Sequence, residues 1–259
     1  MRYAGRDMDA SAPGTDGAEP LAVPSPSPTP RERVLALIEI LLCSDYPTQV
    51  ALAGTFAAFG VRPQSGGPLS LAYVAGLSLL DTLLLTGLIV FFLRARGDRP
   101  RQVFFGDRPV VPELRAGVPL LFVAFGIALA ILLAIQALAP WLHTVPHNPL
   151  QDLVKTPVDA AIFAVVLVVA GGIREEVQRA FLLHRFERWL GGARVGLVVS
   201  SVAFGAGHYI QGADAAVATG VLGAFWGVVY LRRRSIAAPV VSHAGFNLVQ
   251  VMQYLALAR

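Results

Sequence analysis

Residues 116–140 read AGVPLLFVAFGIALAILLAIQALAP and carry no charged side chain. A helix needs about 20 such residues to cross the hydrocarbon core of a bilayer. The whole chain of 259 residues shares this character, because 55% of it is hydrophobic and only 15% is charged, with a mean hydropathy of +0.60. Soluble domains carry about 25% charged residues. The composition therefore excludes a disordered chain, a coiled coil, a disulfide scaffold and an ordinary soluble enzyme, and it predicts an integral membrane protein.

Apolar runs of this kind follow one another, separated by short breaks rich in arginine, proline or glycine. They cover residues 34–61, 69–93, 116–140, 157–173, 195–210, 213–231 and 236–257. The first run contains Glu39, Asp45 and Pro47, which favour a broken helix or an interfacial position there. We expect an all-α fold, a polytopic membrane helical bundle of about seven to eight transmembrane helices, forming a single domain over residues 31–259.

Residues 1–30 differ from the rest in composition. They hold six of the 18 prolines, with serine, threonine and acidic residues between them. Such a segment cannot bury enough apolar surface to offset the entropy lost on ordering. We expect residues 1–30 to be a disordered, Pro-rich cytoplasmic tail, and not a signal peptide, because they contain no apolar core.

Arginines mark alternate breaks between the apolar runs. The basic breaks are residues 94–115, 188–194 and 232–234. Because positive charge gathers on the cytoplasmic side, we expect a cytoplasmic amino terminus and a bacterial inner or plasma membrane location. The formal net charge of +4 is too small for a nucleic-acid footprint. The expected partners are the lipid bilayer and a peptide or membrane-protein substrate, with no nucleic acid.

Ionisable side chains inside a membrane protein are costly and usually functional, and the last third of the chain concentrates them. They and one neighbouring amide are Arg174, Glu175, Glu176, Arg179, His208, His243 and Asn247. Phe204 and His208 are spaced i, i+4, and so are His243 and Asn247. Each pair therefore projects from one helix face.

The depth of two of these residues in the bundle can be compared. Residues 174–190 and 195–210 predict an antiparallel helical hairpin that turns near Gly192. Glu175 lies 17 residues before Gly192 and His208 lies 16 residues after it. At about 1.5 Å rise per residue the two side chains lie at nearly the same level, which favours a single site.

Structural roles are an alternative for each of these residues. The charged residues after position 173 could form an amphipathic surface helix with ion pairs at i+3 and i+4. His208, and His243 with Asn247, could be packing residues that hydrogen-bond between membrane helices. These alternatives weaken when the residues are taken together, because three segments contribute groups with complementary acid–base chemistry.

A carboxylate, two imidazoles and a carboxamide are sufficient for peptide-bond hydrolysis. A desolvated glutamate is suited to act as a general base that takes a proton from water, while one histidine holds that water. The second histidine and the asparagine would donate hydrogen bonds to the developing oxyanion. No serine has the acid–base partners of a nucleophile.

The same side chains leave the metal question open. We expect no required cofactor, but Glu175, His208 and His243 would be the ligands if zinc were bound, since two histidines and one glutamate form a known catalytic zinc pattern. The HExxH motif is absent from the chain. The single cysteine, Cys43, allows neither an intrachain disulfide nor a cysteine cluster for a metal.

Three motifs in this region carry a resemblance to a known family. They read REEVQRAFL over residues 174–182, SSVAFGAGH over residues 200–208 and SHAGFN over residues 242–247. Their order and combination resemble the CPBP (Abi) family, whose best-known members are the type II CAAX prenyl endopeptidases. The resemblance covers about residues 155–255, and the earlier helices match only in being apolar.

The resemblance implies an intramembrane endopeptidase with a polar site inside a helical bundle. Carried over to this chain, the family's catalytic residues are Glu175, His208, His243 and Asn247, with Glu176, Arg179 and Phe204 in support. Eukaryotic members remove the last three residues of prenylated CAAX proteins, whereas many bacterial members are linked to bacteriocin immunity or other peptide processing.

The spacing of the first motif differs from the family pattern. Two residues separate Glu176 from Arg179, where the family usually has three. Alignment on the Glu pair makes Glu175 the base, whereas alignment on Arg179 puts Arg174 in that place and makes Glu175 the second Glu. The depth match with His208 favours Glu175.

The leading hypothesis is an intramembrane endopeptidase that hydrolyses a peptide bond near the cytoplasmic membrane face, in CAAX-type or other peptide processing. The alternative is a non-catalytic membrane scaffold or bacteriocin-immunity protein of the same fold. A proton-coupled transporter ranks last, because the chain lacks the internal repeat that transporters often show.

Overall fold

The computed structural model describes residues 27–64, 69–146 and 150–257. Within these residues the elements are helical, apart from an isolated β-bridge between Gln64 and Leu69. The main helices are α1 (Pro30–Leu42), α2 (Tyr46–Ala58), α3 (Leu71–Ala95), α4 (Pro100–Phe105), α5 (Val110–Leu138), α6 (Pro157–Val166), α7 (Glu175–Trp189), α8 (Ala193–Gly207), α9 (Ala213–Arg233) and α10 (Ala237–Leu257). The predicted all-α membrane bundle is confirmed. The predicted tail covers residues 1–30, of which 1–26 lie outside the described residues. Residues 27–29 precede α1, and Pro30 is its first residue.

Fewer helices meet the length and hydropathy of a membrane span than the seven or eight expected. In the described part of the chain these are α3, α5, the continuous stretch Pro157–Trp189 and α9, with α1 and α2 forming a fifth if the bent pair is one span. Helix α8 has 15 residues, so it rises only about 22 Å. Helix α10 carries His243 and Asn247 as well as glutamines, which lower its hydropathy.

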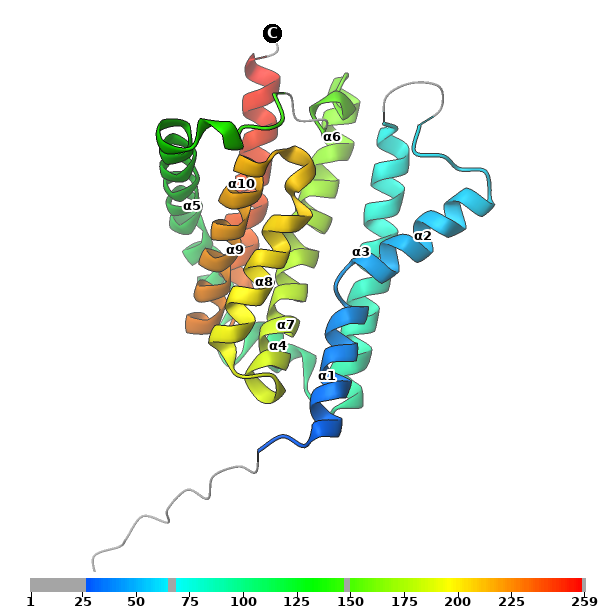
Figure 1. Cartoon of the computed structure of the whole chain (residues 1–259), viewed down its shortest axis with the longest axis vertical. Helices are drawn as coiled ribbons and strands as arrows, with labels where there is room; N and C mark the ends of the chain where they lie inside the picture. Colours follow the sequence, from blue (N-terminus) through cyan, green and yellow to red (C-terminus); the bar gives the residue numbers. More distant parts are fainter. Residues whose placement is uncertain (1–26, 65–68, 147–149, 258–259) are drawn as a thin grey trace, which may run out of the picture.

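The stretch that contains α6 and α7 lies in the middle of the bundle (Figure 1). Helices α5, α8, α9 and α10 pack together on one side of it, and α1, α2 and α3 lie on the other (Figure 1). Helix α7 contacts both α1 and α8. The beginning of α7 is therefore surrounded by helices from both ends of the chain.

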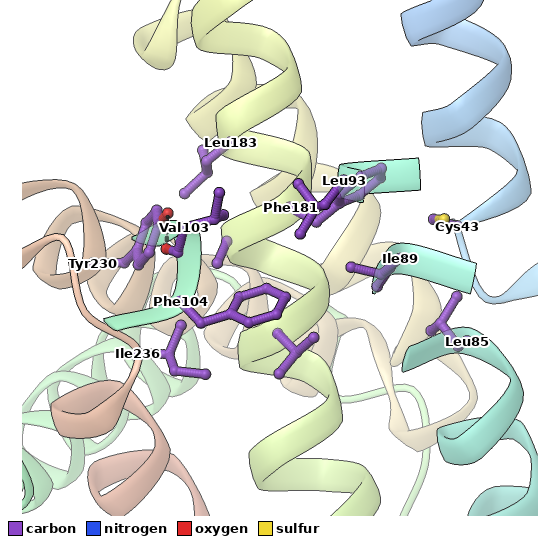
Figure 2. Close-up of a cluster of buried hydrophobic side chains, with 12 residues drawn as sticks. Cys43, Leu85, Ile89, Leu93, Val103, Phe104, Phe181, Leu183, Tyr230 and Ile236 are labelled. Atoms are coloured by element: carbon purple, nitrogen blue, oxygen red, sulfur yellow. Dashed lines mark hydrogen bonds between the residues drawn. The ribbon is translucent and has the colours of Figure 1, made fainter. Parts of the chain in front are cut away.

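Buried apolar side chains fix α7 against its neighbours. Figure 2 shows Phe181 and Leu183 of α7 in a cluster with Leu93 of α3. The short helix α4 inserts Phe104 into the same cluster, and the Tyr230 hydroxyl of α9 donates a hydrogen bond of 2.8 Å to the Val103 carbonyl. Because lipid is as apolar as these side chains, close packing and the polar contact stabilise this arrangement.

The first apolar run is broken, as its polar residues indicated. Helices α1 and α2 meet at an angle of 42°. Asp45 lies at the break with φ of +78°, a left-handed backbone conformation that is costly for a residue other than glycine. The surrounding contacts must hold this residue in place.

An ionic cluster ties α1, the end of α3 and the end of α7 together. Arg185 has no exposed surface, and its Nε lies 2.6 Å from Glu39 Oε2 while its Nη1 lies 2.8 Å from Asp98 Oδ2. Arg96 pairs with the other oxygen of Glu39 at 2.7 Å. These contacts hold the end of α7 that lies farther from Glu175.

Candidate active site

A π-helical segment, η3 (Leu167–Arg174), joins α6 to α7 and ends directly before Glu175. A π-helix has a wider turn than an α-helix and is frequent at functional sites. The segment contains Gly171 and Gly172. The first polar motif therefore begins where the backbone of this span departs from α-helical geometry.

The two glycines let α10 approach this segment closely. A Cβ atom on Gly171 would lie 2.9 Å from Asn247 Nδ2, and one on Gly172 would lie 2.7 Å from the Ala244 Cβ atom. Both distances are too short for real Cβ contacts, so a larger residue at Gly172 would push the two helices apart and one at Gly171 would displace the Asn247 amide. The absent side chains bring His243 and Asn247 of α10 to the start of α7.

His243 lies between the two glutamates of the first motif. Its Nδ1 atom is 2.8 Å from Glu176 Oε1, and its Nε2 atom is 3.6 Å from Glu175 Oε2. Glu176 is almost fully buried, with 1% of its side chain exposed, whereas Glu175 is 13% exposed. Arg179 pairs with the same Oε1 atom of Glu176. The more accessible carboxylate is thus Glu175, and the enclosed one is Glu176.

Aromatic rings enclose His243. The Trp226 ring of α9 stacks on the imidazole with centroids 3.8 Å apart and planes 16° apart. Trp226 Nε1 also donates a 3.1 Å hydrogen bond to Ser242 Oγ, next to His243 in the chain. On another side, the Phe204 ring lies 6.0 Å from the imidazole and 4.7 Å from the Arg179 guanidinium carbon. Sequence reasoning missed Trp226, since no motif included it.

His208 belongs to the outer part of the site. It is the C-cap of α8, and its ring lies 4.8 Å from the Phe204 ring, which in turn lies 6.0 Å from the His243 ring. Its Nδ1 atom is 2.9 Å from the Phe204 carbonyl oxygen. In the described residues no hydrogen bond or ion pair joins His208 to Glu175 or His243. The predicted hairpin of α7 and α8 does form, and it turns at Gly191 and Gly192.

Asn247 lies on the same face of α10 as His243 and is half-buried. Its Nδ2 atom donates a long hydrogen bond of 3.4 Å to the Gly171 carbonyl. The carboxamide is therefore held against η3, one turn from the His243 imidazole.

Arg174 adds a second ionic group to the site. Its Nη1 atom lies 2.5 Å from Asp45 Oδ1 and 2.7 Å from Asp81 Oδ2, and its Nη2 atom lies 3.5 Å from Glu175 Oε1. Asp81 is a buried residue of α3 that none of the sequence motifs included. Asp45 comes from the break between α1 and α2, and sequence reasoning used it only as a mark of that break.

The zinc alternative would require Glu175, His208 and His243 to surround one ion. No group of three or more histidine, cysteine, aspartate or glutamate side chains in the described residues is arranged to hold a metal ion. Glu175 and His243 are close, but His208 is turned to the Phe204 carbonyl. The expectation that no cofactor is required stays a prediction, which metal analysis with and without a chelator tests.

Comparison with known proteins agrees with the motifs. Residues 157–249 match the family model described as Rce1-like, type II CAAX prenyl endopeptidase. The match includes the three motifs and ends before the last turns of α10. No curated protein and no solved structure gives a significant match to the chain. The family described is one of membrane proteases, and residues 157–249 of this chain are similar to this CPBP-type, CAAX-protease-like family.

Proposed function

We propose that this protein is an intramembrane endopeptidase in which Glu175 activates a water molecule for attack on a peptide bond. The observation that supports this most is the position of His243 between Glu176 and Glu175. A histidine fixed by an enclosed carboxylate on one ring nitrogen, with a second carboxylate near the other nitrogen, is an arrangement suited to general base catalysis.

The hydrogen-bonding capacity of these groups supports a water at this point. A carboxylate accepts hydrogen bonds, so the contact with Glu176 places a proton on Nδ1 of His243 and leaves Nε2 of the neutral ring as an acceptor. Nε2 then faces Glu175 Oε2, a second acceptor, at 3.6 Å. With the ring in this form, a water molecule between the two acceptors can donate one hydrogen to each.

The proposed reaction follows from this geometry. Glu175 takes a proton from the water, and the water oxygen forms a bond to the carbonyl carbon of the substrate. The tetrahedral intermediate collapses, the carbon–nitrogen bond breaks, and Glu175 returns the proton to the leaving amine. Each hydrolysis consumes one water and restores the carboxylate, so no further reactant is needed.

The amide of Asn247 and the ring of His208 are proposed to support the oxyanion. Asn247 Nδ2 retains donor capacity beyond its long bond to Gly171. The Nδ1–H of His208 donates to the Phe204 carbonyl, so Nε2 is the ring nitrogen left to contact the oxyanion. His208 donates from Nε2 only as an imidazolium, so this role requires the protonated ring.

The substrate is proposed to be a peptide segment at the cytoplasmic membrane face, of CAAX type or from other peptide processing. The family match supports the CAAX-type substrate. The arginine-rich breaks support the orientation of the protein that this requires.

The proposal is tested by comparing peptide termini in membranes from cells that carry the wild type or Glu175→Gln. Purified protein in liposomes is tested in parallel on a farnesylated CAAX peptide and on the same peptide without the lipid. We expect a new terminus that depends on Glu175. Identical termini in the two strains would overturn the endopeptidase and favour the non-catalytic scaffold or immunity protein.

A further inference from the structure

We propose that Asp45 and Asp81 are positioning residues for Glu175, and that they act by holding the Arg174 guanidinium away from a tight pair with that carboxylate. The inference rests on the proposed function, because it assigns a role to residues that touch neither the water nor the substrate. Both aspartates lie outside the residues that match the family model. The helices before residue 157 would then complete the active site.

The contacts of Arg174 show how its guanidinium is held. Nη1 lies within 2.7 Å of both aspartates, and Nε donates to the Ala170 carbonyl at 3.3 Å. Only Nη2 is turned to Glu175, at 3.5 Å, which is the longest of these contacts. The guanidinium is therefore fixed from the side away from Glu175 and does not form a two-bonded pair with it.

Such a pair would interfere with the proposed chemistry. An arginine and a carboxylate readily form two parallel hydrogen bonds, which stabilise the charged carboxylate. A glutamate stabilised in this way is a weaker base, and its lone pairs are occupied by the arginine. Glu175 Oε2 is instead free to face His243 Nε2.

The number of acids around Arg174 supports this role over a purely structural one. Two arginines with structural roles face fewer acids: Arg233 donates two bonds of 2.6 and 3.0 Å to Glu113, and Arg185 faces Glu39 and Asp98. Arg174 instead faces three carboxylates. Asp81 Oδ1 is buried without a hydrogen-bond partner among the described residues. An uncompensated buried oxygen is costly, so stability alone does not explain the second aspartate.

The local structure at Asp45 supports the same conclusion. Asp45 is the N-cap of α2, where an aspartate usually accepts a hydrogen bond from the first turn of its own helix. Its side chain makes no such bond and pairs with Arg174 instead. The residue also has a positive φ of 78°. Both features lower the local stability of α2 while they direct the carboxylate to Arg174.

The test compares three sets of changes in the full-length protein in liposomes: Asp45→Asn, then Asp45→Asn with Asp81→Asn, and then both with Arg174→Gln. The probe is the peptide cleaved by the wild type, and kcat and KM are measured separately. The single cysteine, Cys43, is fully buried beside the break, and its carbonyl accepts a 2.7 Å bond from Gln178. Its maleimide labelling rate reports whether the break stays against α7.

We expect Asp45→Asn to lower kcat several-fold and the two aspartate changes together to lower it at least 30-fold, with KM changed less than threefold, because Arg174 then pairs with Glu175. Adding Arg174→Gln should recover at least a third of the lost kcat, even if Cys43 still reacts with maleimide faster than it does in the wild type. Glu113→Gln, which breaks a buried pair elsewhere, should leave kcat unchanged.

Two results would overturn the inference. One is full kcat in the variant that lacks both aspartates, and the other is no recovery of kcat when Arg174→Gln is added, which would show a structural role. If the double aspartate variant does not fold, the pair Asp81→Asn with and without Arg174→Gln gives the same comparison. A wild type that cleaves no more than Glu175→Gln would instead reject the proposed function, and the inference with it.

Discussion

His243 Nδ1 lies 2.8 Å from Glu176 Oε1, and this contact joins the middle of α10 to the first turn of α7. Its two residues are 67 positions apart in the chain. The same Glu176 oxygen also receives Arg179. Glu176 therefore orients the imidazole and is enclosed, while the adjacent Glu175 is left to face Nε2.

Glu176→Gln should damage both the stability of the protein and the orientation of His243. Loss of the carboxylate leaves buried Arg179 unpaired, and breaking a buried ion pair costs about 3–5 kcal/mol. We expect a clear drop in the unfolding temperature in detergent and a fall in kcat. Glu175→Gln should keep the unfolding temperature within a few degrees and lose turnover. The reverse assignment of the two glutamates is supported if Glu176→Gln stays as stable as the wild type and alone abolishes turnover.

Trp226→Leu should lower kcat about tenfold or more with little change in KM. The indole stacks on His243 at 3.8 Å, and its removal frees the imidazole to rotate away from Glu175. Ser242→Ala is the matched control, because it removes the hydrogen bond that Trp226 makes but keeps the stacked ring. Equal kcat in Trp226→Leu and the wild type would show that the stacking does not position His243.

Gly172→Ala should separate η3 from α10 and reduce activity. The added Cβ would lie 2.7 Å from the Ala244 Cβ atom, and overpacking of this kind costs about 1–3 kcal/mol. Adding Ala244→Gly removes this nearest atom but leaves the Ala244 Cα atom at 3.2 Å, so we expect the double variant to recover part of the lost stability and kcat. Gly87→Ala on α3, with nothing within 4 Å, is the control. If the double variant recovers neither stability nor kcat, close packing at Gly172 is not the cause of the loss in Gly172→Ala.

Asp98 should make the stability of the protein depend on pH in the acidic range. Burial raises the pKa of this carboxyl, but hydrogen bonds and charge from Arg185, His184 and Arg188 lower it more, so the pKa lies below its usual value. A lowered pKa stabilises the folded protein at pH values above the pKa of the unfolded state, which is about 3.9. This stabilisation is lost as the pH falls through the pKa of the folded state. The difference in unfolding temperature between the wild type and Asp98→Asn should therefore be largest near pH 6 and shrink towards pH 3. A constant difference would contradict this assignment.

The sequence predicted the features that depend on local pattern. Apolar runs and their breaks were sufficient for the all-α membrane bundle, and Asp45 and Pro47 indicated the break between α1 and α2. The i, i+4 spacing of His243 and Asn247 identified one face of α10. Fewer helices than expected meet the length and hydropathy of a membrane span because α8 is short and because polar residues lower the hydropathy of α10.

The remaining features depend on contacts between distant segments. Arg174 pairs with Asp45 and Asp81, which lie 129 and 93 residues away, and no local pattern reports such pairs. Trp226 looked like any apolar residue of α9. The depth match predicted that Glu175 and His208 lie at one level, but it could not predict that the Phe204 ring lies near both His208 and His243.

The central claim, that Glu175 activates water, is tested most directly by cleavage in H2(18)O. Purified wild type and Glu175→Gln are incubated in liposomes with a synthetic peptide that spans the cleaved bond, and the products are analysed by mass spectrometry. We predict that the wild type gives a new carboxyl terminus with one 18O atom and that Glu175→Gln forms product at least a hundred times more slowly. Product formation by Glu175→Gln at the wild-type rate would contradict the account.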